Sequence, residues 1–351
     1  AFAFPRLFRD GLRSAARLNS PGELGPWDGL IREPREFLAK IDRQGLSPSA
    51  LEEFRNCPFK TFASRLLGLK EVETPSRAGE LDPREKGRLY HAVLERFYRA
   101  LDAGGFWEDP EAVRWQTTLE ACFTELLPWD GWRALGVYPV LWKAAQAAMR
   151  RHLLRVVEAD IAALRLRGLR PRSFESELTA AVDGLRLQGK LDRIDWDVAG
   201  SAYRVVDYKT TFHQGRLENL VARLKQIQPP LYLELVESSD TAVPKGAQPL
   251  GADFFAIEDS KETTGHEAVQ SFEAVSWRKL RPLLLDGLRG LREMMARGEF
   301  FITPQEGRGE ACEYCPFGSL CRKSHGMTLR RAESSRLRVR FDLLREPEAA
   351  R

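Results

Sequence analysis

The spacing of hydrophobic residues predicts a chain that is mostly helical. Between residues 83 and 101 the apolar residues recur every fourth position, which is typical of one face of an α-helix: Leu89, Val93, Phe97 and Leu101. Similar spacing predicts helices over residues 48–57, 111–127, 139–167, 215–237 and 272–297. Ser47 and Pro48 provide an N-cap and a first-turn proline for the first of these helices. The pair Pro229-Pro230 predicts an interruption within residues 215–237.

One central stretch has a different pattern, in which polar and apolar residues alternate. The alternation extends over residues 174–210 and includes ESELTAAV, LRLQGKLDRIDWD and YRVVDYKT. Asp183-Gly184 is a two-residue hairpin signal, and residues 199–201 form a second turn signal. These features predict a three-stranded antiparallel meander, with a further strand at 252–257. The fold class is therefore α/β, with a mixed central sheet flanked by helices.

Composition and charge fit a globular chain. The 351 residues include 43% hydrophobic and 30% charged residues, and no run of about 18 apolar residues predicts a membrane-spanning helix. The net charge is only +4, but residues 322–351 hold nine Lys or Arg against four Asp or Glu. We expect 326–351 to be a basic C-terminal tail that is either a phosphate contact or a solvated end.

The N-terminal stretch predicts a connection to a longer protein. Residues 1–45 are rich in Arg, Gly and Pro, and the chain opens with AFAFPRLFRD instead of Met. We expect 1–45 to be a connector from an upstream module, and the whole chain to be a fragment. No secretory signal is visible and the cysteines are few, so the cytoplasm is the expected compartment.

The meander carries the residues with the clearest chemistry. Asp207 and Lys209 are two residues apart on a predicted strand, so their side chains point to the same face. Asp192 lies on the preceding strand, where a hairpin can bring it next to Asp207. A divalent cation such as Mg²⁺ or Mn²⁺ would relieve the repulsion between two carboxylates, and a nearby lysine can stabilise a developing negative charge. The alternative interpretation is a pair of surface charges on an exposed strand face.

Three of the five cysteines raise a second question about metals. Cys312, Cys315 and Cys321 follow the spacing C-x2-C-x5-C, which provides three soft ligands where zinc or an iron–sulfur cluster usually takes four. Cys122 lies in an apolar helical pattern and is most simply a core residue. Spacing alone does not separate zinc from an iron–sulfur cluster.

Several motifs together resemble one family of enzymes. GKLDRID followed by VVDYKT resembles the PD-(D/E)XK nuclease superfamily in its RecB-like branch. The segment LSPSALEEFRNCPF resembles the entry segment of that branch, GRLYHAVLERF its G-x-x-x-H-x-x-L-E motif, and QPPLY its Q-x-x-x-Y motif. The motifs occur in the family's order over residues 46–325. The resemblance implies a restriction-endonuclease-like core in a nuclease domain of that extent.

The resemblance also implies roles for individual residues. It implies four metal ligands, of which Tyr208 would use its backbone carbonyl: His91, Asp192, Asp207 and Tyr208. Lys209 would be the catalytic lysine, and Gln228 and Tyr232 would contact DNA or brace that lysine. Glu177, on the strand before GKLDRID, would be an accessory acidic residue.

For the cysteines, the resemblance implies a shared cluster. The fourth ligand would be Cys57, 255 residues before Cys312, and the four would hold a [4Fe–4S] cluster: Cys57, Cys312, Cys315 and Cys321. Such a cluster would staple the segment before the nuclease core to the segment after it and close a very long loop. Zinc remains the rival ion.

Within the branch, the stretch ELGPWDGLI before LSPSALEEF resembles the join in AddB-type helicase–nuclease proteins, which carry a C-terminal iron–sulfur nuclease domain. The resemblance implies a Mg²⁺- or Mn²⁺-dependent exonuclease that cuts single-stranded DNA in double-strand break repair and recombination, with a helicase as partner and no membrane. Two alternatives stay open at this point. One is a catalytically silent DNA-binding clamp in such a complex, and the other is a CRISPR-adaptation-type nuclease.

Overall fold

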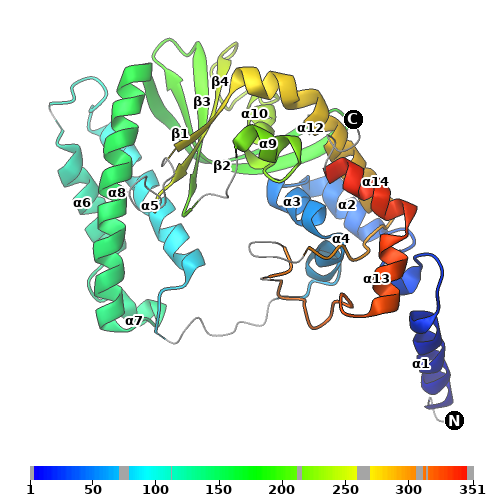
Figure 1. Ribbon diagram of the computed structural model, residues 1–351. Helices are drawn as coiled ribbons and strands as arrows, with labels where there is room; N and C mark the ends of the chain where they lie inside the picture. The colour runs from blue at the N-terminus through cyan, green and yellow to red at the C-terminus, as the bar shows by residue number, and fades with distance from the viewer. Residues whose placement is uncertain are drawn as a thin grey trace.

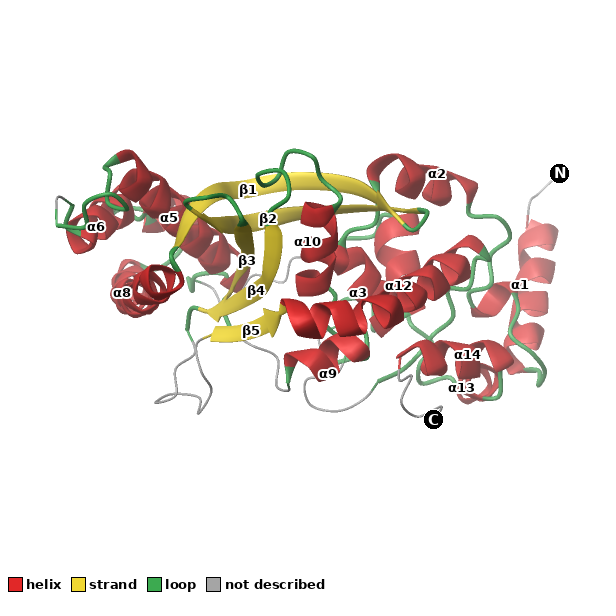
Figure 2. Cartoon of the chain, turned by 90° about the horizontal axis from the view of Figure 1, so that it is seen from above, coloured by secondary structure: helices red, strands yellow, loops and turns green. Residues whose placement is uncertain are grey.

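A five-stranded mixed sheet lies between two groups of helices (Figures 1 and 2). The computed structural model describes residues 4–70, 79–111, 113–211, 216–258, 269–305, 311–313 and 315–345. The strands follow the chain order β1-β2-β3-β4-β5 across the sheet. Their bounds are β1 Leu169–Val182, β2 Leu185–Asp197, β3 Ala202–Lys209, β4 Gln248–Ala256 and β5 Val269–Glu273.

The antiparallel meander predicted from the alternating pattern is confirmed as β1, β2 and β3. Asp183 and Gly184 both have positive φ, 51° and 77°, as a two-residue hairpin turn of the favoured twist requires. β3 pairs in parallel with β4, and β4 pairs antiparallel with β5, so the sheet is mixed as predicted. The sequence did not predict β5, because five residues are too few to establish a period of two.

Two hydrophobic cores lie on opposite faces of the sheet. Alternate residues of β3 and β4 point to different cores: Val205 and Phe254 contact one, and Val206 and Phe255 contact the other. The helices over the second face are α5 Pro83–Ala103, α6 Trp115–Leu126 and α8 Pro139–Arg167. The principal helices over the first face are α2 Arg35–Gln44, α3 Pro48–Asn56, α10 Gln228–Glu237 and α12 Ala274–Ala296.

The predicted helices are confirmed, with two changes of boundary: the helix expected from residue 111 begins at Trp115, and the stretch 215–237 is divided. Ser47 caps α3 by accepting a hydrogen bond from the Ala50 N–H at 3.2 Å. The stretch 215–237 consists of two helices, α9 Leu217–Ala222 and α10, and the break lies at 223–227 instead of at the prolines. Pro229 and Pro230 are in the first turn of α10, where their missing N–H groups have no intrahelical partner to lose.

Both ends of the described chain are helical and contact the rest of it, α1 through its C-terminal end, where the Leu18 carbonyl accepts from Arg331. The remaining short helices are α1 Phe4–Asn19, η1 Pro26–Asp28, α4 Pro58–Thr61, η2 Phe62–Leu66, α7 Trp132–Leu135, α13 Gly326–Glu333 and α14 Arg336–Arg345. The Ile31 N–H donates to the Gly298 carbonyl at 2.8 Å, and Arg331 forms a buried ion pair with Asp28 at 2.6 Å. Segments predicted to be a connector and a tail thus contact the same body, and the division at residues 45 and 325 stays a prediction.

Among the described residues, no helix combines the length and the apolar character that crossing a membrane requires.

Candidate active site

Two neighbouring strands bring the predicted metal ligands together. Arg193 of β2 pairs with Val206 of β3, so Asp192 and Asp207 occupy the next position on each strand. Asp192 Oδ2 accepts a hydrogen bond from the Tyr208 N–H at 2.8 Å. The alternating pattern and the hairpin signal were therefore sufficient to predict that these carboxylates are neighbours.

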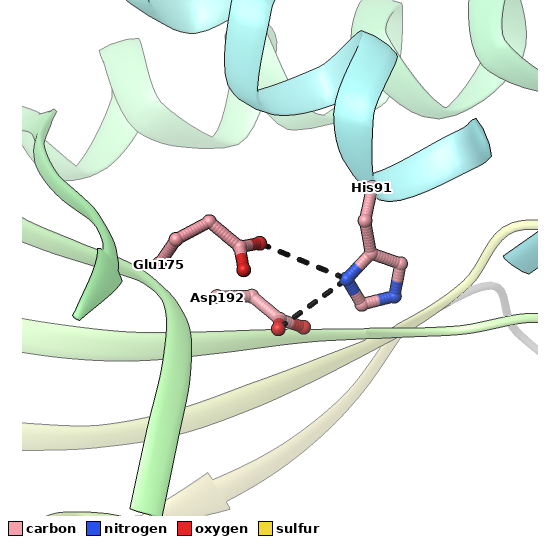
Figure 3. Close-up of side chains that lie close together, drawn as sticks. All are labelled: His91, Glu175 and Asp192. Atoms are coloured by element: carbon pink, nitrogen blue, oxygen red, sulfur yellow. Dashed lines mark ion pairs between the residues drawn. The ribbon is translucent and has the colours of Figure 1, made fainter. Parts of the chain in front are cut away.

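The predicted histidine reaches the same place from helix α5. His91 Nε2 lies 3.0 Å from the Tyr208 carbonyl oxygen. Its Nδ1 lies 3.3 Å from Asp192 Oδ1 (Figure 3). The imidazole thus contacts both the backbone oxygen and one carboxylate of the predicted ligand set. The helix that covers one face of the sheet is what places this side chain at the strands.

A second carboxylate stands beside His91, and it is not the predicted one. Glu175 Oε1 lies 4.0 Å from His91 Nδ1 (Figure 3). Glu175 also pairs with Lys190. Glu177 is exposed and pairs in register with Lys190 on the next strand. The two glutamates lie two positions apart on β1, and they differ in backbone conformation. Glu175 has φ +51°, a local distortion that no sequence pattern signals.

Without a cation, Asp207 and His91 in this cluster bind protons more tightly than usual, because the pKa of each is raised. Burial raises the pKa of Asp207 to about 7; Lys209 opposes this shift and Asp192 adds to it. For His91, burial lowers the pKa, but the hydrogen bond to Asp192 and the nearby carboxylates outweigh it and raise the pKa overall. Donor atoms of His91, Glu175 and Asp192 lie within 4.8 Å of one another. Two carboxylates and one imidazole in this arrangement fit a divalent cation.

The predicted catalytic lysine lies directly beside one carboxylate. Lys209 Nζ is 2.7 Å from Asp207 Oδ2, and it lies 5.7 Å from the centroid of the Phe254 ring. The lysine side chain is 32% exposed while that of Asp207 is 5% exposed. The ammonium group of Lys209 is therefore accessible to a ligand from the solvent, whereas the Asp207 carboxylate is buried beneath it.

Gln228 and Tyr232 brace the carboxylate from helix α10. Gln228 Nε2 donates to Asp207 Oδ1 at 3.1 Å and contacts Tyr232 Oη at 2.8 Å. Tyr232 Oη in turn donates to the Lys190 carbonyl at 2.9 Å. Gly189 makes this approach possible, because a Cβ there would lie 2.7 Å from Leu235 Cδ1 and 2.9 Å from Tyr232 Cε1. The glycine of GKLDRID is thus a packing requirement of α10.

A buried ionic network supports the opposite face of the same strands. The Arg193 guanidinium, 1% exposed, pairs with Asp160 of α8 and with Asp195, and it donates to Tyr208 Oη at 2.5 Å. Burial raises the pKa of Asp195 to about 7, against the effect of Arg193. Breaking one member of such a buried set leaves an uncompensated charge. The network therefore holds the Tyr208 ring in place. Fixing this residue also positions its backbone carbonyl, which lies beside His91.

The four cysteines of the predicted cluster line one small cavity: Cys57, Cys312, Cys315 and Cys321. Cys57 ends α3 and starts α4, and the Gln305 N–H contacts Cys312 Sγ at 3.3 Å. Burial, and then the three neighbouring thiols, raise the pKa of Cys321 to about 11. Sulfur donors gathered in this way need a cation before they can be thiolates together, so the set fits a four-sulfur metal site. Cys122 lies apart in the core of α5, α6 and α8, as predicted.

These features coincide with the results of comparison with known proteins. The profile of the PD-(D/E)XK nuclease superfamily matches residues 45–322, most of the chain. The chain therefore belongs to the PD-(D/E)XK nuclease superfamily, and its mixed sheet with flanking helices is the α/β core of that class.

The curated relatives are AddB-type components of helicase–nucleases. An AddB-type ATP-dependent helicase/deoxyribonuclease protein from Moorella thermoacetica is 30% identical over 271 residues, which cover 71% of this chain and 23% of the relative. The protein of the same name from Ruminiclostridium cellulolyticum is 26% identical over 274 residues, covering 70% of this chain and 23% of the relative. The match thus spans less than a quarter of each relative. The predicted resemblance to the AddB-type proteins is confirmed.

Proposed function

We propose that this chain is the nuclease domain of an AddB-like helicase–nuclease, active in the cytoplasm as a metal-dependent exonuclease on single-stranded DNA during double-strand break repair and recombination. The observation that carries the proposal is the contact between Lys209 Nζ and Asp207 Oδ2 beside the His91–Asp192 pair. A lysine, two carboxylates and a histidine at one sheet position form a set suited to phosphodiester hydrolysis.

Each residue of the chain has a separate task in this proposal. His91, Asp192, Asp207 and the Tyr208 carbonyl would hold Mg²⁺ or Mn²⁺, with Glu175 as a further carboxylate beside them. The bound ion would supply a water of lowered pKa and positive charge beside the scissile phosphate. Lys209 would stabilise the negative charge that develops on the phosphoryl oxygens. Gln228 would keep the Asp207 carboxylate in one orientation through its 3.1 Å hydrogen bond.

The cysteine site has a structural task in the proposal. Cys57, Cys312, Cys315 and Cys321 would hold a [4Fe–4S] cluster, which would join α3 to the segment after α12. The names of the relatives support a helicase partner and a DNA substrate, because each is called part of an ATP-dependent helicase/deoxyribonuclease.

The test is a cleavage assay on end-labelled DNA. Wild-type protein is incubated with single-stranded or double-stranded DNA and Mg²⁺, beside an EDTA sample and the variants Asp207→Ala and Asp286→Asn. We expect Mg²⁺-dependent shortening of the single strand by wild type and by Asp286→Asn, whose side chain is 76% exposed. We expect Asp207→Ala to bind DNA without cleaving it. Equal cleavage by wild type and Asp207→Ala would refute the assignment, and binding without cleavage by every sample would favour a silent clamp.

A further inference from the structure

The first turn of α10, which carries Gln228, has no cap of its own. The N-cap residue Ile227 makes no side-chain capping hydrogen bond. A helix start leaves about four N–H groups without intrahelical partners. Here Pro229 and Pro230 have no N–H to offer, so the unpartnered donors are the N–H groups of Ile227 and Gln228.

A carboxylate from a different helix accepts from the first of these groups. Glu52 Oε1 accepts from the Ile227 N–H at 2.7 Å, and Gln228 is the next residue. Glu52 belongs to α3, far from α10 in the sequence. A negative charge at a helix N-terminus also interacts favourably with the helix dipole. The carboxylate thus does for α10 what an N-cap side chain does within a single helix.

A second residue of α3 contacts the same connection. Arg55 Nε, one helical turn after Glu52, donates to the Arg223 carbonyl at 3.0 Å in the link between α9 and α10. α3 therefore contacts both ends of the segment that leads into Gln228.

The carboxylate is also next to the lysine of the site. Glu52, Lys209 and Gln228 together line a polar cavity of about 220 Å³. Glu52 thus fixes the backbone of Ile227, the residue before Gln228, and Asp207 and Tyr232 fix the Gln228 side chain. A shift of the helix start would move the amide that orients Asp207.

We infer that Glu52 is a positioning residue for the nuclease site: it caps α10 from α3 and so holds Gln228 against Asp207. The inference rests on the proposed function for its kinetic consequence. Its structural half, the capping of α10, stands on the hydrogen bonds alone.

The kinetic test is a double-mutant cycle in the full chain. Loss of a hydrogen bond to a charged group lowers a rate that depends on it by about ten- to a hundredfold. We therefore expect Glu52→Ala to lower kcat at least about tenfold and to leave KM within about twofold. In a Gln228→Ala background the same change should cost less than about threefold, because the two residues act through one contact. Glu52→Gln keeps one acceptor oxygen and should recover most of the rate.

Glu53→Gln is the matched control. Glu53 is the next residue of α3, and it pairs with Arg65 at 2.9 Å instead of with α10. This variant should cleave at the wild-type rate. A loss at Glu52→Ala that is equally large in the Gln228→Ala background would overturn the inference, as would wild-type kcat in Glu52→Ala.

Amide hydrogen exchange separates this inference from the proposed function, since it needs no activity. The Ile227 amide should exchange at least about tenfold faster in Glu52→Ala than in wild type or Glu53→Gln. Unchanged exchange at this amide would overturn the capping role even if the enzyme is active. If the wild type cleaves no DNA, the proposed function fails, and the exchange result alone decides whether Glu52 caps α10.

Discussion

Asp207 is a carboxylate in a position that favours its neutral form. Its side chain is 5% exposed, and its partners are the Lys209 ammonium and the Gln228 amide. Burial is the main reason that its pKa rises to about 7. Without a cation the group holds its proton well above the usual range of aspartate, and a metal ligand must release that proton.

This protonation predicts how metal affinity depends on pH. Because the proton on Asp207 competes with the ion below about pH 7, Mn²⁺ affinity should rise about fivefold from pH 6 to 7, about tenfold in all by pH 8, and level off above that. The raised pKa of His91 acts in the same direction. Electron paramagnetic resonance of free Mn²⁺ would measure the affinities, with Asp207→Asn as the variant that should bind weakly with a shallower pH dependence. Equal wild-type affinity at pH 6 and pH 8 would contradict the account.

Individual residues also mark the limits of prediction from sequence. Asp192 and Asp207 were predicted to be neighbours because a strand pattern and a hairpin turn suffice for that conclusion. Glu175 was missed in favour of Glu177, since a positive φ depends on the packed backbone. The contact of Glu52 with Ile227 was beyond prediction because it joins residues 175 positions apart, with no shared local pattern.

At the scale of elements, the site depends on how closely α10 approaches β2. The alternating pattern and the presence of a helix could be predicted, whereas the helix start at Gln228 could not, and the approach distance depends on Gly189. The side chains of Tyr232 and Leu235 occupy the space that a Cβ at Gly189 would take. Tyr232 then donates a hydrogen bond to the carbonyl of Lys190, which lies two residues before Asp192 on β2.

The crowding at this glycine predicts the effect of one added methyl group. Gly189→Ala should force α10 away from β2 and lower the free energy of unfolding by about 1–3 kcal/mol, as overpacked cores do. Cleavage should fall as well, because Gln228 and Tyr232 move with the helix. Thermal or urea unfolding would measure the loss. The control is Gly11→Ala, because a Cβ at Gly11 would meet no atom within 4 Å. If neither substitution lowered the free energy of unfolding, the close approach of α10 to Gly189 would be contradicted.

At the scale of the molecule, distant segments are joined around the cysteines. Cys57 ends α3, and Thr303 Oγ1 donates to the carbonyl of the preceding residue, Asn56, at 3.2 Å. The cysteine site thus adjoins the C-terminal end of α3, and Glu52, which caps α10, lies in the middle of the same nine-residue helix. A metal site that fixes the end of α3 would also steady Glu52.

The cysteine site predicts a defined metal content. Cys57→Ser and Cys315→Ser should each lose bound iron and the brown colour and should melt at a lower temperature, because a long loop is no longer closed. Cys122→Ser should keep its iron, since that residue lies in the other core. Elemental and sulfide analysis after purification without air is the measurement. Zinc in place of iron in the wild type would contradict the cluster, and no metal at all would contradict the site.

Two arginines of the basic C-terminal segment form ion pairs that its net charge does not predict. The predicted basic tail contributes Arg331 to a buried pair with Asp28, and Arg340 to a pair with Glu299. These two guanidinium groups therefore join the C-terminal helices to the rest of the chain. Composition predicted the excess of positive charge correctly, but the partners come from segments about 300 and 41 residues away. Their tertiary pairing could not be inferred from sequence.

The central claim is that one metal site and one lysine hydrolyse DNA together. Single-turnover cleavage of end-labelled DNA by Lys209→Ala, with Mn²⁺ affinity measured on the same sample above pH 8, tests this claim most directly. Because the lysine stabilises charge but holds no ion, we predict a cleavage rate at least about a hundredfold lower and Mn²⁺ affinity within about threefold of wild type. Wild-type cleavage by Lys209→Ala would contradict the account.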